Sequence, residues 1–85
     1  MSRHKKLVQR LLGQPKDFTW EELVRVLDGF GYELQKPGKT SGSRRRFYRQ
    51  GYPPIDLHQP HPKNIVKMYQ IKQVIANLKN EGLIP

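Results

Sequence analysis

The spacing of apolar residues changes from a helical period to an alternating period and back again along this chain, which restricts the possible folds. Residues 3–12 and 19–31 carry apolar side chains three and four positions apart, so two amphipathic helices are predicted. Alternating patterns bounded by glycine and proline then predict three strands, at residues 32–36, 45–49 and 55–58. Helical spacing returns from Lys67, and Gly82 ends that helix. This order indicates an α+β domain, with helices on one face of a three-stranded antiparallel sheet.

The second helix has the clearest N-terminal signal. Thr19 and Glu22 form the capping-box pattern, in which each side chain bonds to the backbone of the other residue. The apolar stripe of this helix consists of Trp20, Leu23, Val24, Leu27 and Phe30. Trp20 is therefore interpreted as a core residue rather than a base-stacking one.

The first helix is too short to be stable by itself, so it is expected to pack on the domain or on a partner. His4 is placed in a mobile tail and receives no role.

The predicted strand register separates two faces of the sheet. One face turns Leu34, Phe47, Ile55 and Leu57 toward the helices. The opposite face then displays Glu33, Gln35, Arg44, Arg46, Tyr48, Asp56 and His58. Arg45 points inward in this register, so its guanidinium has to reach water at an edge. The exposed set is interpreted either as a binding surface or as a solvated face with Arg–Asp and Arg–Glu pairs.

Charge indicates the class of partner. The chain has a formal net charge of +9, and no acidic residue occurs between Glu33 and Asp56, a window with six of the sixteen lysines and arginines. Cations beside aromatic rings suit a polyanion with stackable bases, although a soluble basic surface is the alternative. The sequence has no cysteine, which excludes disulfides and thiolate zinc sites. Apolar runs are too short for a membrane span or a signal peptide, so a cytoplasmic location is expected.

The order of elements resembles the double-stranded-RNA-binding fold, and the motifs resemble the HicA family of mRNA interferase toxins. The similarity extends from about Phe18 to Leu83, which implies that residues 1–17 are an N-terminal helical extension and that residues 18–85 form the main domain. It rests on Glu22-Leu23-Val24, Gly31-Tyr32-Glu33-Leu34, Gly42-Ser43, His61-Pro62 and Tyr69-Gln70-Ile71-Lys72-Gln73-Val74-Ile75. The resemblance implies a metal-independent endoribonuclease that cleaves mRNA, needs no cofactor and is neutralised by a HicB antitoxin. In that family a histidine follows Gly-Ser, whereas this chain has Arg44, which cannot act as a general base.

Two other histidines could replace the missing acid–base group. RNA cleavage without a metal needs a base for the 2′-hydroxyl proton, an acid for the leaving oxygen and a cation beside the phosphate. His58 is the first candidate and His61 the second, with Arg44 and Arg46 stabilising charge. Alternatively, His58 only caps the strand or contacts the RNA backbone. The two histidines have no third ligand that would complete a zinc site, so no metal is expected.

The predicted RNA-binding residues surround the Gly-Ser turn: Lys36, Lys39, Gly42, Ser43, Arg44, Arg46 and Tyr48. Tyr48 could stack on a base or be an ordinary strand aromatic. Tyr69 could serve either purpose. The alternative function is a non-catalytic RNA-binding module that has lost the catalytic histidine. The surroundings of Arg44 distinguish this module from the nuclease: if no histidine lies near Arg44 in the folded chain, the binding module is favoured. Sequence-specific DNA binding also fits the charge, but no helix-turn-helix pair is found.

Overall fold

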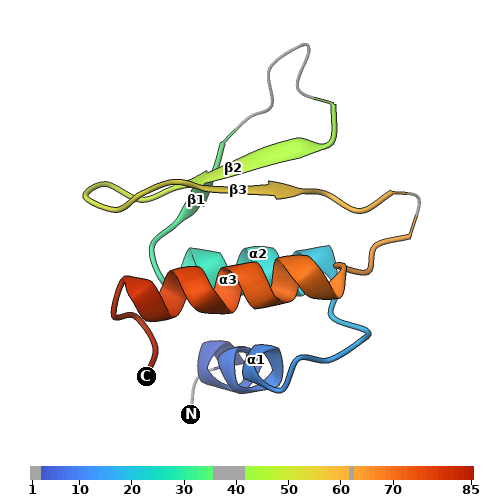
Figure 1. The fold of residues 1–85 in the computed structure, drawn as a ribbon, viewed down its shortest axis with the longest axis horizontal. Helices are drawn as coiled ribbons and strands as arrows, with labels where there is room; N and C mark the ends of the chain where they lie inside the picture. The colour runs from blue at the N-terminus through green and yellow to red at the C-terminus, as the bar shows by residue number, and fades with distance from the viewer. Residues whose placement is uncertain (1–2, 36–41, 62) are drawn as a thin grey trace.

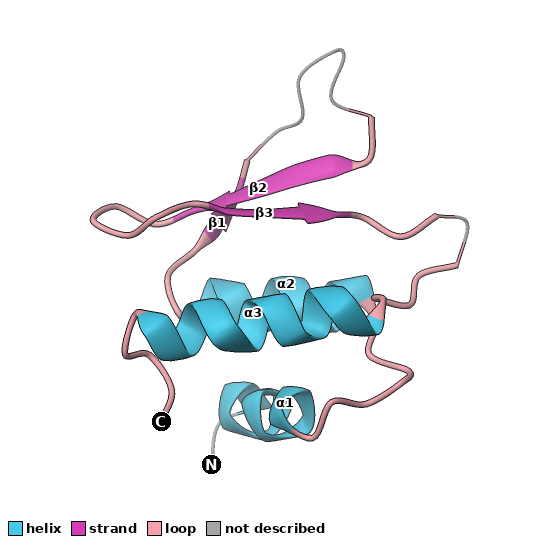
Figure 2. Ribbon diagram, in the orientation of Figure 1, coloured by secondary structure: helices cyan, strands magenta, loops and turns pink. Residues whose placement is uncertain are grey.

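The computed structural model describes residues 3–35, 42–61 and 63–85, so Lys36 and Lys39 lie outside the described residues. The elements occur in the predicted order (Figures 1 and 2). Their bounds are α1 Arg3–Leu12, α2 Trp20–Gly29, β1 Glu33–Leu34, β2 Arg44–Tyr48, β3 Ile55–His58 and α3 Met68–Asn80. The predicted α+β class with a three-stranded antiparallel sheet is confirmed.

The elements form three layers (Figure 1). The strands lie in the order β1-β2-β3, α2 and α3 cover one face of this sheet, and α1 packs on the far side of the two helices. The opposite face of the sheet has no helix over it among the described residues. None of the described helices is long and apolar enough to cross a membrane.

Glycine ends α2 and α3 in the same way. At the end of α2, Gly31 has a φ of +88°, the Gly31 N–H donates to Asp28 O, and the Tyr32 N–H donates to Leu27 O. This is the Schellman motif, which needs a left-handed residue after the helix. Gly82, with a φ of +73°, ends α3 with the same pair of bonds. Because Tyr32 takes part in the end of α2, β1 is shorter than the predicted strand.

The core lies between the sheet and the helices and extends to α1 through Leu11. Phe47, Ile55 and Leu57 point into it, as predicted. Leu34 is paired with Phe47 but is 40% exposed, because it belongs to the short edge strand. The predicted stripe of α2 omitted Val26, which is fully buried, and two of its members, Val24 and Phe30, pack at the periphery of the core.

His4 corrects the prediction of a mobile tail. Its Nε2 atom lies 3.0 Å from Val26 O, and its ring meets the Phe30 ring edge-on at 4.7 Å between centroids. Arg10, in the last turn of α1, forms ion pairs with Glu22 at 3.1 Å and Asp17 at 3.0 Å. Polar contacts near both ends therefore hold α1 on α2, and Leu11 places it in the core.

Glu22 gives this contact a dependence on pH. Its carboxylate completes the capping box with Thr19 and accepts the Arg10 bond, and the Arg10 bond is the main reason that the pKa of Glu22 is lowered. A lowered folded-state pKa means that the contribution to stability is present above the unfolded-state pKa and is lost as pH falls through the folded-state value. Between pH 6 and pH 3, the Tm of wild type should therefore fall further than that of Glu22→Gln. Glu33→Gln, on β1, is the control; an equal fall in wild type and Glu22→Gln would contradict this assignment.

Candidate nucleic-acid interface

The open face of the sheet carries the predicted array. The register pairs Arg44 with His58, Arg46 with Asp56 and Glu33 with Tyr48. Directly paired residues in antiparallel strands project from the same face, with Cβ atoms about 4.5–5.5 Å apart. His58 is therefore the direct cross-strand neighbour of Arg44, and the side chains of both residues are exposed.

The two outward arginines of β2 differ in their contacts. Arg46 holds Asp56 through two bonds, Nε to Oδ1 at 2.8 Å and Nη2 to Oδ2 at 3.2 Å. These bonds are the main cause of the lowered pKa of Asp56. The Arg44 guanidinium forms no hydrogen bond or ion pair within the described part of the chain. Arg44 is thus the outward cation of β2 whose guanidinium has no hydrogen-bonded partner among the described residues, although its charge also favours the ionised form of Asp56. A phosphate could reach Arg44 without displacing a bonded carboxylate, whereas at Arg46 it would have to compete with Asp56.

The side chain of Arg45 starts on the inward face of the sheet, and its guanidinium forms hydrogen bonds at the end of the sheet. Its Nε donates to Gln59 Oε1 at 3.0 Å, and its Nη1 donates to the carbonyl oxygens of Gly42 and Arg44, each at 2.8 Å. The guanidinium therefore leaves the core at the end of the sheet, as predicted for a snorkelling side chain. Gly42 has a φ of +57°, which accounts for a glycine at this turn. These bonds join the start of β2 to the residue that follows β3.

Side chains of α3 hold the outer edge of β3. Gln70 is only 3% exposed, and its amide makes two bonds to the backbone of His58. The His58 N–H donates to Gln70 Oε1 at 2.6 Å, and Gln70 Nε2 donates to His58 O at 2.8 Å. One turn later, Gln73 Nε2 donates to Asp56 O at 3.2 Å. Gln70 thus fixes the main chain from which the His58 imidazole projects.

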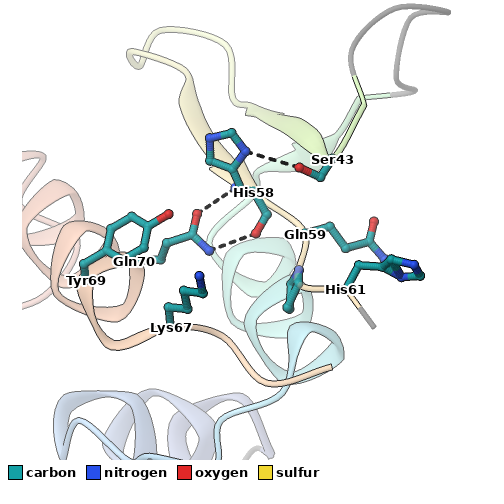
Figure 3. A pocket seen from close by; sticks show the side chains of 8 residues that line it. Ser43, His58, Gln59, His61, Lys67, Tyr69 and Gln70 are labelled. Carbon is teal, nitrogen blue, oxygen red and sulfur yellow. Dashed lines mark hydrogen bonds between the residues drawn. The ribbon is translucent and has the colours of Figure 1, made fainter. Parts of the chain in front are cut away.

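A polar cleft of about 380 Å³ lies where β3 ends and α3 begins (Figure 3). It is lined by Ser43, His58, Gln59, Pro60, His61, Lys67, Tyr69 and Gln70. A second cleft of about 290 Å³ adjoins it, and Ser43, Gln59, Pro60 and His61 line both. The residues that line the first cleft come from three separate segments of the chain, which explains why sequence spacing alone did not reveal it.

The two histidines of the cleft have different surroundings. His58 Nδ1 lies 3.4 Å from Ser43 Oγ, and Figure 3 shows the imidazole directed toward that hydroxyl. The His61 ring lies beside the Gln59 side chain, away from His58 (Figure 3). The described residues include no group of three or more histidine, aspartate and glutamate side chains that could hold a metal ion.

The model of the family described as the HicA toxin of bacterial toxin–antitoxin matches residues 20–82. The chain belongs to the HicA toxin family. It is therefore the toxin of a toxin–antitoxin pair, and such a pair implies an antitoxin partner. No curated protein and no solved structure matches the chain.

The HicA match includes the Gly42-Ser43-Arg44 turn, both histidines of the cleft and all of α2 and α3, but not α1. Sequence reasoning missed Lys67 and Gln70 as parts of the cleft and left Tyr69 undecided. A signal was present for Gln70, which is the polar member of the buried stripe that continues through Ile71, Val74, Ile75 and Leu78. A glutamine in that position needs buried partners for its amide.

Proposed function

We propose that this toxin is a metal-independent endoribonuclease that cleaves mRNA. The observation that carries the proposal is the position of His58, opposite Arg44 on the open face of the sheet and beside Ser43 in the polar cleft. An ionisable imidazole next to an unpaired guanidinium is the combination that RNA cleavage by the 2′-hydroxyl needs. By the criterion set from the sequence, a histidine close to Arg44 favours the nuclease over the binding module.

The proposed reaction is an internal transfer at one phosphodiester. A base removes the 2′-hydroxyl proton, the 2′ oxygen attacks phosphorus, and the bond from phosphorus to the 5′ oxygen breaks as that oxygen gains a proton. The products are a 2′,3′-cyclic phosphate and a 5′-hydroxyl. We assign base or acid catalysis to His58, and we assign stabilisation of the negative phosphorane to Arg44, whose planar guanidinium can hold two phosphate oxygens. His61 remains the second candidate for the acid–base group.

The RNA is proposed to lie along the open face of the sheet. Arg46 and the exposed Tyr48 are on that face, and Gly42 and Ser43 form the turn at its end. Lys36 and Lys39, outside the described residues, are proposed as further phosphate contacts. The affinity of the protein for RNA should fall as the salt concentration rises, because each phosphate that the protein contacts releases counterions.

The proposed partner is a HicB-like antitoxin that covers the same open face. The support is electrostatic: a chain of net charge +9 with an exposed, arginine-rich sheet face is complementary to an acidic protein. A protein bound there would block RNA from both Arg44 and His58. We place this action in the cytoplasm, where mRNA is available.

The test is incubation of a labelled mRNA with the purified protein in EDTA, with RNA binding measured in parallel. The proposal predicts cleavage under these conditions. Binding without cleavage would instead support the alternative, a non-catalytic RNA-binding module in which Arg44 has replaced the catalytic histidine.

A further inference from the structure

The reaction proposed above gives no role to several side chains of the polar cleft, among them Lys67, Tyr69 and Ser43. Lys67 is the N-cap of α3, and Tyr69 lies in the first turn of that helix. Figure 3 shows both side chains extending from the start of α3 toward His58. The start of α3 and the end of β3 thus form two sides of one cleft, with the Ser43–His58 contact at its margin.

The charge of the cleft favours an anion. None of the residues that line it is acidic. The Lys67 side chain is exposed, and its ammonium forms no hydrogen bond or ion pair within the described residues. An unpaired ammonium with a nearby hydroxyl and imidazole can bind a phosphate as a point charge supported by hydrogen bonds.

Tyr69 adds a flat apolar surface to the cleft. It is 57% exposed, more than any other large apolar or aromatic side chain described as exposed. Its neighbours Gln70 and Ile71 are buried, so the backbone beneath the ring is fixed by the core. An exposed aromatic ring on a fixed backbone, in the same cleft as a cation, is an arrangement on which an unpaired base can stack.

We propose that this cleft binds one unpaired nucleotide of the RNA, with its phosphate on Lys67 and its base stacked on Tyr69. The volume of about 380 Å³ lies within the range of small-ligand sites, about 300–1,000 Å³. A base inside a duplex has both faces covered by its neighbours, so it cannot stack on a side chain without leaving the helix. The substrate class is therefore single-stranded RNA, although the resemblance is to a fold that binds double strands. This inference rests on the proposed function, because it places the nucleotide beside His58.

Binding is tested with the full chain and an RNA that cannot be cut. The probe is a fluorescent single-stranded oligoribonucleotide with a 2′-O-methyl group on every residue, and its affinity is compared with that of the matched duplex by anisotropy. Wild type should prefer the single strand. Tyr69→Ala should weaken single-strand binding by about tenfold, as expected for the loss of one stacked base, whereas Tyr69→Phe should retain it.

The role of Lys67 is tested separately, by the salt dependence of RNA binding, and with a matched control variant. Lys67→Gln should lower the slope of log K against log salt by about 0.7, the value for one lost phosphate contact on a single strand. Lys72→Gln changes an exposed lysine within α3 that does not line the cleft, and it should have a smaller effect. Circular dichroism would establish that each variant is folded.

The outcomes separate the two proposals. Wild-type affinity in both Tyr69→Ala and Lys67→Gln, or a preference of wild type for the duplex, would overturn the nucleotide site. If unmodified RNA were still cleaved in EDTA, the proposed nuclease function would stand even though the nucleotide site was overturned. If wild type bound neither single strand nor duplex and cleaved no RNA, both proposals would fail.

Discussion

His58→Ala is expected to slow RNA cleavage by about 10²-fold or more while RNA binding is retained. Alanine removes the imidazole proposed to transfer the proton but leaves the Arg44 guanidinium and the Lys67 ammonium in place. The His58 side chain is exposed at the end of β3, so its loss should not unfold the domain. Single-turnover cleavage and equilibrium binding of the same RNA are the measurements.

Two matched variants define what the His58 result means. His61→Ala removes the second histidine of the cleft, whose ring lies away from His58, and cleavage should fall much less. Arg44→Ala should impair both binding and cleavage, because it removes a phosphate contact as well as charge stabilisation. Cleavage by His58→Ala at the wild-type rate would remove His58 from the reaction, and a large loss in His61→Ala alone would assign the role to His61.

Gln70→Met is expected to reduce both stability and cleavage. The substitution preserves the approximate size of the side chain but leaves the His58 N–H and C=O without the amide that they bond. An unsatisfied buried polar group costs about 1–3 kcal/mol, so the loss is a large part of the few kcal/mol available to a small domain. Unfolding in urea measures the first effect. At a temperature where the variant is folded, kcat should fall with little change in KM, because the His58 imidazole is no longer held in position.

The neighbouring glutamine is the control for this experiment. Gln73→Met removes one bond, to Asp56 O, from an exposed side chain one turn away, so a small loss of stability and unchanged cleavage are expected. Gln70→Glu retains an acceptor for the His58 N–H and should recover part of the activity relative to Gln70→Met. If Gln70→Met lost stability and retained wild-type kcat, Gln70 would be structural only.

Much of the fold could be predicted because its signals are local. Thr19 and Glu22 lie three residues apart and form the capping box that starts α2. Gly31 and Gly82 adopt the left-handed conformation that ends α2 and α3. Alternation in residues 55–58 specified which side chains of β3 enter the core, and pairing then placed Arg44 beside His58.

The features that sequence reasoning missed depend on contacts between distant residues. His4 is ordered by Val26 and Phe30, which are more than twenty positions away, and nothing near it in the sequence indicates that packing. Lys67 and Tyr69 belong to the cleft only because the chain between β3 and α3 returns the start of the helix to the end of the strand. Gln70 was detectable as a polar residue on an apolar stripe, but its partner, the backbone of His58, could be identified only in the folded chain.

The most direct test of the central proposal is the chemistry of the ends that wild type leaves on a labelled RNA in EDTA. Attack by the 2′ oxygen, with His58 transferring protons, predicts fragments that carry a 2′,3′-cyclic phosphate and a 5′-hydroxyl. RNA in which the 2′-hydroxyls are methylated should bind and remain intact. Binding of unmodified RNA without cleavage, or cleavage that requires a divalent cation and leaves 5′-phosphate ends, would contradict the proposal.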